Sequence, residues 1–222
     1  MDIERQFSEA ELRVVEAAIH EAENRSRAEI VIVATASSDG YDGAPWRGAA
    51  FGAVSFALAA GVASWFGGFW GGALWLTSAL PTVCGAVLGY FLVDRIPALR
   101  RRFIAPETLD RRVHRRAAAA FLEHEVFATR DRSGVLLFLS LFEHRAVVLG
   151  DSGINALVHA DEWRAVVADL CRRMGTGEVA AGLVKAVEAC GELLDRRGLE
   201  SRPDDRDELP NRVRLDHDHP RS

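Results

Sequence analysis

The chain has 222 residues, a formal net charge of −5 and three cysteines. The mild acidity argues against nucleic acid as the main partner, because nucleic-acid-binding domains carry excess positive charge. The cysteines are too few and too scattered for a disulfide framework or a metal cluster. We expect Cys84, Cys171 and Cys190 to act as small hydrophobic residues.

The amino-terminal part predicts a helix followed by a strand. Ser8 can cap the helix, and Glu11, three residues later, completes a capping box. Apolar residues then recur at helical spacing as far as Ile19. The β-branched run at 29–35 predicts a buried strand, and a polar, glycine-bearing loop follows it.

The longest feature of the sequence is the segment 48–93, which contains no Asp, Glu, Lys, Arg or His. A membrane-spanning helix needs about 20 apolar residues, so this segment is long enough for two spans and a tight turn. Glycines at 67–72 interrupt it near the middle. We therefore predict a transmembrane helical hairpin over 44–97, with spans near 49–66 and 73–93.

Aromatic residues support this interpretation. Trp65 and Phe66 lie near the glycine break, while Trp46 and Tyr90 lie near the opposite end. Aromatic rings favour the membrane–water interface, where one edge stays apolar and the other meets polar groups. The alternative is a hairpin buried in a soluble core, which a domain of this size is poorly able to provide for so long a polar-free stretch.

A basic segment follows the second predicted span. Residues 94–116 contain eight arginines against three acids, a local balance of +5, whereas the turn between the spans has no charge. Because positive residues stay on the cytoplasmic side, we predict that both termini are cytoplasmic. The same arginines could bind anionic lipid head groups; a topology signal is the simpler interpretation.

The remaining chain alternates helices and strands. A helix is predicted from Pro106. A nearly unbroken apolar run predicts a strand over 134–141, which turns at Glu143-His144 into a second strand over 146–149. Two more helices are predicted from Ala160 and from about Val179. From Leu199 on, the chain is charged and nearly without large apolar residues, so we expect a disordered tail over 199–222.

The strand at 29–35 has no partner unless it joins the strands at 134–149 in one sheet. We therefore predict a single α/β domain made of residues 1–43 and 98–198. In this interpretation the hairpin at 44–97 is an insertion into that domain, not a linker between two domains.

Several short motifs in this order resemble the TPM domain family. They are the run Arg132–Arg145, the segments Val147–Ile154 and Ala160–Trp163, the stretch Gly177–Leu183, and the opening piece Ser8–Val33. The resemblance covers about residues 6–43 and 104–195. It implies a three-layer α/β/α sandwich, frequent membrane attachment, and a role in repairing or modulating membrane protein complexes. Acid phosphatase activity and divalent metal binding are associated with some members of the family.

The chain departs from the common arrangement of that family, in which a signal peptide precedes the domain and the domain faces away from the cytoplasm. Here the membrane segment lies inside the domain. Partners and compartment therefore do not transfer simply from the family to this chain.

A metal site is the sharpest chemical hypothesis. Asp131, Asp151, Asp161 and Glu162 all lie at loop ends beside predicted strands or a helix start. Clustered carboxylates suit Ca²⁺ or Mg²⁺, and the β-hairpin should bring Asp131 and Asp151 to the same end. The simpler interpretation is that Asp161 and Glu162 begin a helix and that Asp151 belongs to a turn. Otherwise we expect no cofactor.

No phosphatase motif accompanies these acids: the sequence lacks a cysteine phosphate loop, an Asp-x-Asp-x-Thr nucleophile run and a Gly-Lys-Ser loop. His217 and His219 in the tail are a further weak metal candidate. We therefore expect a multi-pass protein of the inner (plasma) membrane that acts as an interaction or maintenance module for a membrane protein complex. A metal-dependent acid phosphatase on the same fold is the alternative.

Overall fold

The computed structural model describes residues 3, 6–67, 74–199, 209–210 and 212–216. The chain forms two compact units, one made of Met1–Ser38 with Asp110–Ser222 and the other of Asp39–Leu109. We refer to them as unit 1 and unit 2. The glycine-rich turn predicted near 67–72 and most of the predicted tail, including His217 and His219, lie outside the described residues.

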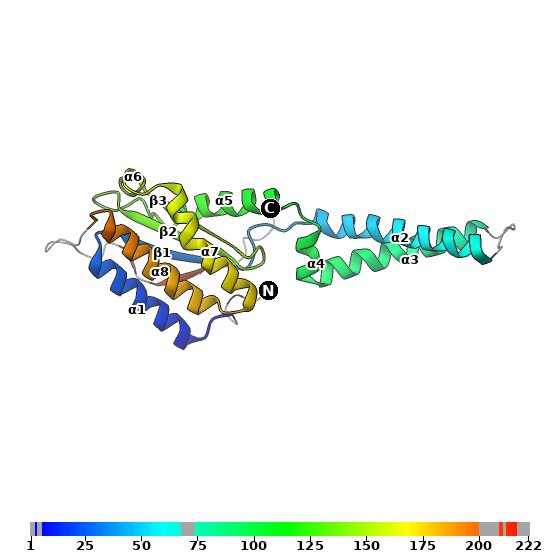
Figure 1. Ribbon diagram of the computed structural model, residues 1–222, viewed down its shortest axis with the longest axis horizontal. Helices are drawn as coiled ribbons and strands as arrows, with labels where there is room; N and C mark the ends of the chain where they lie inside the picture. The colour runs from blue at the N-terminus through cyan, green and yellow to red at the C-terminus, as the bar shows by residue number, and fades with distance from the viewer. Residues whose placement is uncertain (1–2, 4–5, 68–73, 200–208, 211, 217–222) are drawn as a thin grey trace. The chain divides into compact units, whose positions relative to one another are not determined.

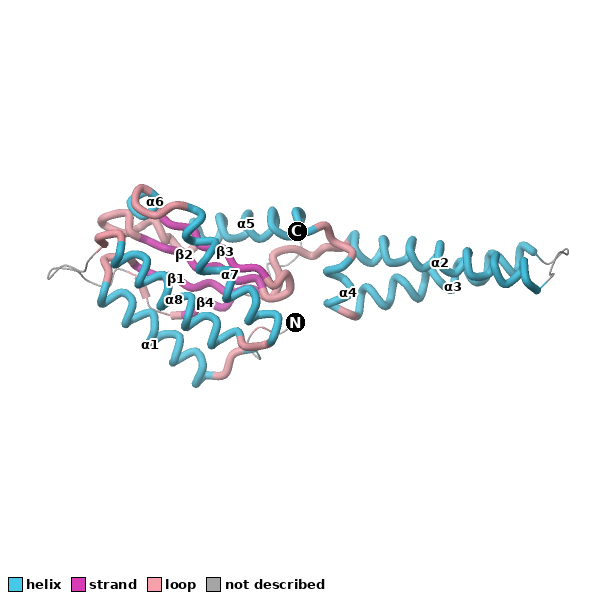
Figure 2. Tube along the Cα trace, in the orientation of Figure 1, coloured by secondary structure: helices cyan, strands magenta, loops and turns pink. Residues whose placement is uncertain are grey.

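Unit 1 is a mixed α/β unit built on a four-stranded sheet, which Figures 1 and 2 show with its flanking helices. Its elements are α1 (Glu9–Arg25), β1 (Glu29–Thr35), β2 (Gly134–Ser140), β3 (Arg145–Gly150), α6 (Ser152–Asn155), α7 (Ala160–Thr176), α8 (Val179–Arg196) and β4 (Val213–Asp216). α5 (Pro106–Glu123) leads from unit 2 back into unit 1. The predicted capping box is present, since Ser8 Oγ accepts from Glu11 N and Glu11 Oε2 accepts from Ser8 N.

The strand order is β3-β2-β1-β4. β1 pairs with β2 in parallel along its whole length, from Glu29 opposite Gly134 to Thr35 opposite Ser140. β2 and β3 form the predicted antiparallel hairpin. The prediction that the strand at 29–35 joins those at 134–149 in one sheet is therefore confirmed.

Helices cover both faces of this sheet, which explains why β1 and β2 are apolar without alternation. On one face, Ile30, Ile32 and their neighbours pack with α1, α7 and α8 in the larger core cluster. On the other face, Val31, Val33 and Phe138 pack with α5. Every residue of β1 and β2 is buried.

The prediction of a disordered tail is wrong at Val213–Asp216, which form β4 and pair in parallel with β1. Val213 and Leu215 alternate with charged residues and pack on the larger core cluster. Arg116 on α5 forms an ion pair with Asp216 and another with Glu123, at 2.9 Å. This segment buries too little surface to fold alone, but the open edge of β1 supplies its hydrogen-bond partners.

Unit 2 is a helical hairpin made of α2 (Gly43–Gly67) and α3 (Leu74–Arg95), followed by the short α4 (Pro97–Arg102). Both long helices have the length and the apolar composition needed to cross a membrane. Unit 2 runs from Asp39 to Leu109 and is therefore longer than the predicted 44–97. The difference arises because α4 packs on α3 and α2.

The two helices touch through glycines. Gly48 and Gly52 of α2 face Gly89 and Gly85 of α3, so closely that an added Cβ on Gly48 would lie 2.7 Å from the Gly89 carbonyl oxygen. An added Cβ on Gly52 would overlap the backbone of Gly85. Each pair has the Gly-x-x-x-Gly spacing, which lets helix backbones approach where lipid supplies no hydrophobic driving force.

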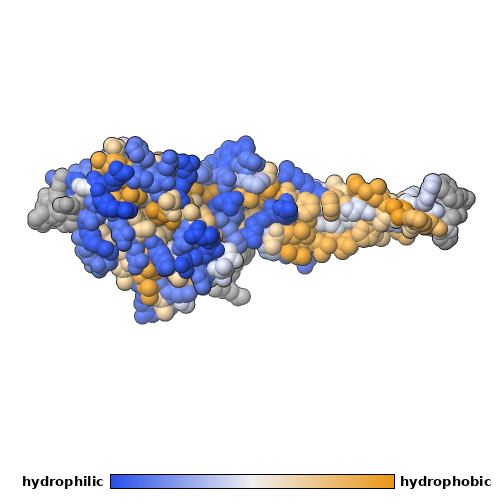
Figure 3. All heavy atoms as spheres, in the orientation of Figure 1, coloured by the Kyte–Doolittle hydropathy of each residue, from blue (hydrophilic) through white to orange (hydrophobic). Residues whose placement is uncertain are grey.

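Large apolar side chains point outward from the hairpin, and on the face that Figure 3 shows, much of α2 and α3 is hydrophobic. Phe51, Leu58 and Trp65 are each between 65% and 69% exposed. An exposed apolar surface of this extent is abnormal for a helix pair in water. The other exposed large hydrophobic residues of α2 and α3 are Trp46, Val54, Phe56, Val62, Phe66, Leu76, Leu80, Val83, Val87, Leu88, Phe91 and Leu92.

The glycine contact predicts a position-specific effect of added bulk. We expect Gly52→Leu to force the helices apart and to destabilise the hairpin by about 1–3 kcal/mol, the usual cost of overpacking. Thermal unfolding of the detergent-solubilised chain measures this. Gly61→Leu is the matched control, because nothing lies within 4 Å of a Cβ at Gly61. Equal unfolding temperatures for the two variants would contradict the glycine contact.

Candidate functional site

The carboxyl ends of β1 and β2 meet at one edge of the sheet, where ligands commonly bind in sheets with parallel strands. β1 ends at Thr35 and continues into the loop toward unit 2, while β2 ends at Ser140 and enters a tight turn. This turn contains Glu143, which is 2% exposed. The edge therefore holds a buried carboxylate, which requires compensating partners.

Three serines supply those partners. Glu143 accepts hydrogen bonds from the backbone N–H of Ser38 at 2.8 Å and from Ser37 Oγ at 3.4 Å. Ser140 Oγ donates to the other carboxylate oxygen, Oε2. Ser38 Oγ in turn donates to Ser140 Oγ at 2.7 Å. We call Ser37, Ser38, Ser140 and Glu143 the serine–glutamate cluster.

Backbone hydrogen bonds hold the same two loops together. Leu141 N donates to Thr35 O at 3.0 Å, and Phe142 N donates to Ala36 O at 2.9 Å. His144, which closes the turn, has a left-handed backbone with a φ of 50°. The β1–β2 pairing thus continues beyond both strands, and the cluster secures the residues at which the chain leaves unit 1.

The chain Ser38–Ser140–Glu143 has the order of a nucleophile, a relay and a base. However, Ser140 is completely buried and Glu143 nearly so, and Ser38 is only half-exposed. Each of the three serine hydroxyls also donates to a protein atom. This geometry suits a structural role, in which the cluster holds the loop that leads into unit 2, better than nucleophilic attack by a serine on a substrate. We call this contact the clasp.

The predicted metal ligands lie at the opposite edge, by the amino ends of β1 and β2. The hairpin does bring the turns of Asp131 and Asp151 together: Gly153 N donates to Arg132 O at 3.1 Å, and Asp151 N donates to Gly134 O at 2.9 Å. The topological argument for their proximity therefore holds for the backbone. Their carboxylates, however, have different partners.

Each predicted ligand contacts an arginine. Asp131 lies 3.5 Å from Arg27, and Asp151 lies 3.5 Å from Arg132 while also capping α6 through Ser152 N at 2.6 Å. The remaining pairs are Asp161 with Arg164 and Glu162 with Arg197.

Two hydrogen bonds lower the pKa of Glu162. The larger effect comes from the Arg197 side chain, and the smaller comes from the backbone N–H of His159. Asp161 and Glu162 occupy the first turn of α7, as ordinary helix-start residues do. Within the described ranges, no group of three or more His, Cys, Asp or Glu side chains converges as a metal site requires. A Ca²⁺ or Mg²⁺ site at Asp131, Asp151, Asp161 and Glu162 therefore stays a prediction without a convergent ligand set.

The cysteines have no common site. Cys190 is fully buried in the larger core cluster, and burial raises the pKa of its thiol to about 12. Burial also raises the pKa of Cys171, while Cys84 is exposed on α3. Because the thiolate is the reactive form, Cys190 is a packing residue, as predicted from the sequence.

Sequence reasoning missed two features. It assigned Glu143 only to a turn, although an acid three residues beyond a mostly apolar strand signals a buried, partnered carboxylate. It also treated the uncharged segment as two spans without noticing the matched Gly-x-x-x-Gly motifs at 48–52 and 85–89. That spacing would have predicted the contact between the helices.

No protein-family model and no curated protein matches this chain. Among solved structures it is similar to the NMR structure of the BA42 protein from the psychrophilic bacterium Bizionia argentinensis sp. nov.. The two share 19% sequence identity, the alignment covers 95% of each chain, and the TM-score is 0.58. At this identity the likeness shows a shared fold, and membership of the TPM family stays a prediction.

The clasp predicts that the Glu143 carboxylate stabilises unit 1. We expect Glu143→Ala to cost about 2–4 kcal/mol, because it leaves the Ser38 N–H and the Ser140 hydroxyl without their acceptor. Unfolding by denaturant measures the loss. Glu188→Ala is the matched control on the exposed side of α8 and should change stability by less than about 0.5 kcal/mol. Equal losses in the two variants would show that the cluster contributes nothing.

Proposed function

We propose that this protein is a membrane-anchored interaction module. In this proposal α2 and α3 span the bilayer and hold the α/β unit at its cytoplasmic face, where that unit binds or maintains a membrane protein complex. The observation that carries the proposal is the apolar outer surface of α2 and α3 around a glycine-to-glycine contact. A helix pair built this way buries its apolar surface in lipid.

The lengths fit a bilayer. Trp46 and Trp65, both 69% exposed, lie near the two ends of α2. At 1.5 Å per residue they are separated along the helix axis by about 28 Å, close to the thickness of a hydrocarbon core. Trp46 also packs edge-on against Tyr90 of α3, with ring centroids 5.2 Å apart. This pair has the composition of an interfacial aromatic belt.

The proposed topology follows from charge. Arg47, Arg95 and the arginines of α4 lie at the end of the hairpin that continues into unit 1. The segment between α2 and α3 has no charged residue. We propose that the protein lies in the inner (plasma) membrane with both termini cytoplasmic.

The α/β unit is the proposed interaction part. Its likeness to the BA42 structure supports the α/β fold, and the resemblance of its motifs to TPM domains suggests maintenance of a membrane complex. The serine–glutamate cluster fills the carboxyl edge of β1 and β2 with the protein's own hydrogen bonds. We therefore place partner binding on the outer surface of this unit, with the bilayer as its other partner and without nucleic acid.

Membrane insertion and topology are tested with single-cysteine variants of the full chain in which the three native cysteines are replaced. We expect the protein to stay in the membrane after alkaline carbonate washing. An impermeant maleimide should label Phe66→Cys in intact cells and Glu188→Cys only after permeabilisation, since both positions are exposed. Release by carbonate would contradict insertion, and reversed labelling would contradict the topology.

The phosphatase alternative is tested on the purified full chain with p-nitrophenyl phosphate and Mg²⁺ or Ca²⁺ across acidic and neutral pH. We expect no turnover above the background without protein, whereas partners should co-purify with the chain from its own membrane. Turnover that Asp151→Asn abolishes, but Asp169→Asn does not, would replace the interaction module with an enzyme. Asp169 is the control because it also pairs with arginines, at 2.6 and 2.8 Å.

A further inference from the structure

The hairpin ends in a short basic helix. Ile96 N donates to Leu92 O at 3.1 Å and Arg100 N donates to Ile96 O at 2.9 Å, so that α4 follows α3 with almost no break. We propose that this end of unit 2 is a binding surface for the phosphate groups of anionic phospholipids, with Arg95 and Arg102 as its ligands. This inference rests on the proposed membrane insertion of α2 and α3.

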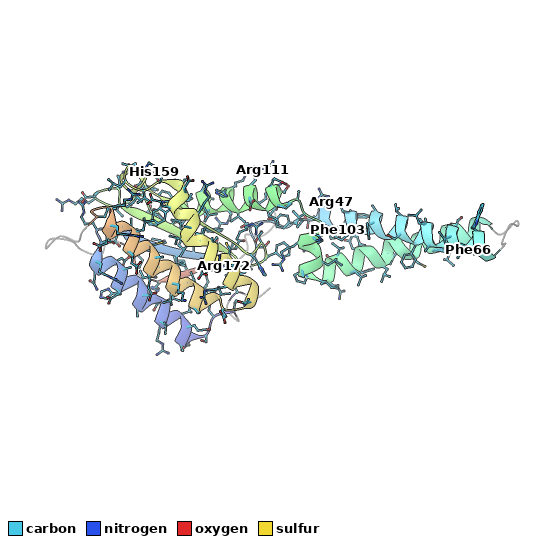
Figure 4. The ribbon with its side chains drawn as sticks, viewed as in Figure 1. Arg47, Phe66, Phe103, Arg111, His159 and Arg172 are labelled. Carbon is cyan, nitrogen blue, oxygen red and sulfur yellow. The ribbon has the colours of Figure 1, made fainter. Side chains whose placement is uncertain are left out.

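Two of the arginines in this region have structural roles. Arg47 donates to the carbonyl oxygen of Phe103 at 2.9 Å, and Figure 4 labels both residues. Arg100 donates to the carbonyl oxygen of Gly40 at 2.6 Å and lies 3.9 Å from the carboxylate of Asp42. These contacts tie the loop before α2 and the end of α4 to the hairpin, so both guanidinium groups already have partners within unit 2.

Arg95 and Arg102 differ from this pair. Both are exposed, and no carboxylate or carbonyl of the described residues bonds to either guanidinium. Asp94 is the nearest acid in sequence and is also exposed, yet the segment 94–102 holds four arginines against this one acid. Exposed arginines that no described residue pairs with, directly beyond a proposed span, attract the anionic surface of a membrane.

The apolar residues near Arg95 and Arg102 suit the head-group level of a bilayer. Ile96, between the two arginines in sequence, is 43% exposed, and Phe91 on the last turns of α3 is 52% exposed. Trp46 lies at the same end of the hairpin, where its ring meets Tyr90. Aromatic rings prefer the head-group level, which places the guanidinium groups beside lipid phosphates.

The chemistry selects the ligand class. A guanidinium can donate two parallel hydrogen bonds to the oxygens of one phosphate, and it is less strongly hydrated than an ammonium group. The phosphate of an anionic phospholipid has no cation of its own beside it, whereas a zwitterionic lipid carries a cation that competes with the guanidinium for the phosphate. The surface should therefore prefer phosphatidylglycerol or cardiolipin over phosphatidylcholine.

A topology signal alone would not require such a preference, because the positive-inside rule acts during insertion. A lipid-binding surface and a topology signal can be distinguished in the purified, detergent-solubilised full chain, because its insertion is already complete. Native mass spectrometry counts bound lipid, and thermal unfolding followed by tryptophan fluorescence reports its effect. The probes are phosphatidylglycerol, phosphatidylcholine and inorganic phosphate.

We expect phosphatidylglycerol to bind and to raise the unfolding temperature, and phosphatidylcholine and inorganic phosphate to have little effect. In the double variant Arg95→Gln/Arg102→Gln, the apparent affinity for phosphatidylglycerol should fall about 25-fold, at about fivefold for each arginine near a membrane surface. Raised salt should weaken wild-type binding in the same direction. Arg13→Gln/Arg25→Gln removes the same charge from α1, where both arginines lie in exposed ion pairs with glutamates one turn earlier. This control variant should bind lipid as the wild type does.

Equal binding of phosphatidylglycerol and phosphatidylcholine would overturn the inference, and so would equal losses in the two double variants. If inorganic phosphate binds as well as the lipid does, the surface is a general anion site and the proposal is wrong. Failure of membrane insertion itself is a separate result: carbonate washing would release the chain. A chain that stays in the membrane but shows no lipid preference would contradict only the lipid surface.

Discussion

The parallel pairing of β1 with β2 is the interaction on which the rest of this structure depends. These two strands lie on either side of unit 2 in the sequence, yet they match residue for residue over seven positions. The serine–glutamate cluster and two backbone hydrogen bonds extend the pairing past the strand ends. The chain therefore leaves unit 1 from a point that these contacts hold in place, and a strand that follows unit 2 in the sequence pairs with the strand that precedes it.

The helix pair of unit 2 is stabilised in a different way from the sheet of unit 1. In water, a helix pair is stabilised by burying apolar side chains between the helices; here the large apolar side chains point outward and glycines meet in the middle. In lipid this arrangement is reasonable, because outward apolar side chains contact lipid tails at no cost in free energy and the two helix backbones gain van der Waals contact at the glycines. Arg47 and Arg100 then fasten the polar end of the hairpin through carbonyl oxygens, while Arg95 and Arg102 face outward.

Much of the fold could be predicted from the sequence because its signals are local. The capping box at Ser8, the apolar runs at 29–35 and 134–141, and the uncharged segment each specify one element without reference to the rest. β4 could not be found this way. Val213 and Leu215 are too few to bury a useful surface alone, and their value depends on the open edge of β1.

The candidate site was harder to predict for the same reason. Loop position correctly suggested that Asp131 and Asp151 have neighbouring backbones, but arginines remote in sequence determine where the carboxylates point: Arg27 for Asp131 and Arg197 for Glu162. Glu143 takes Ser37 and Ser38 as partners from the loop after β1, more than one hundred residues earlier in the chain, in addition to the nearby Ser140. Only the folded sheet brings these residues together.

The most direct test of the account is the depth of the hairpin in a lipid bilayer. A spin label at Leu58, in the middle of α2 and 65% exposed, should collide with dissolved oxygen far more often than with an aqueous nickel complex. A label at Val14 of α1, which is 58% exposed, should show the opposite preference. If the Leu58 label is as accessible to nickel as the Val14 label, α2 does not lie in the membrane and the central claim is wrong.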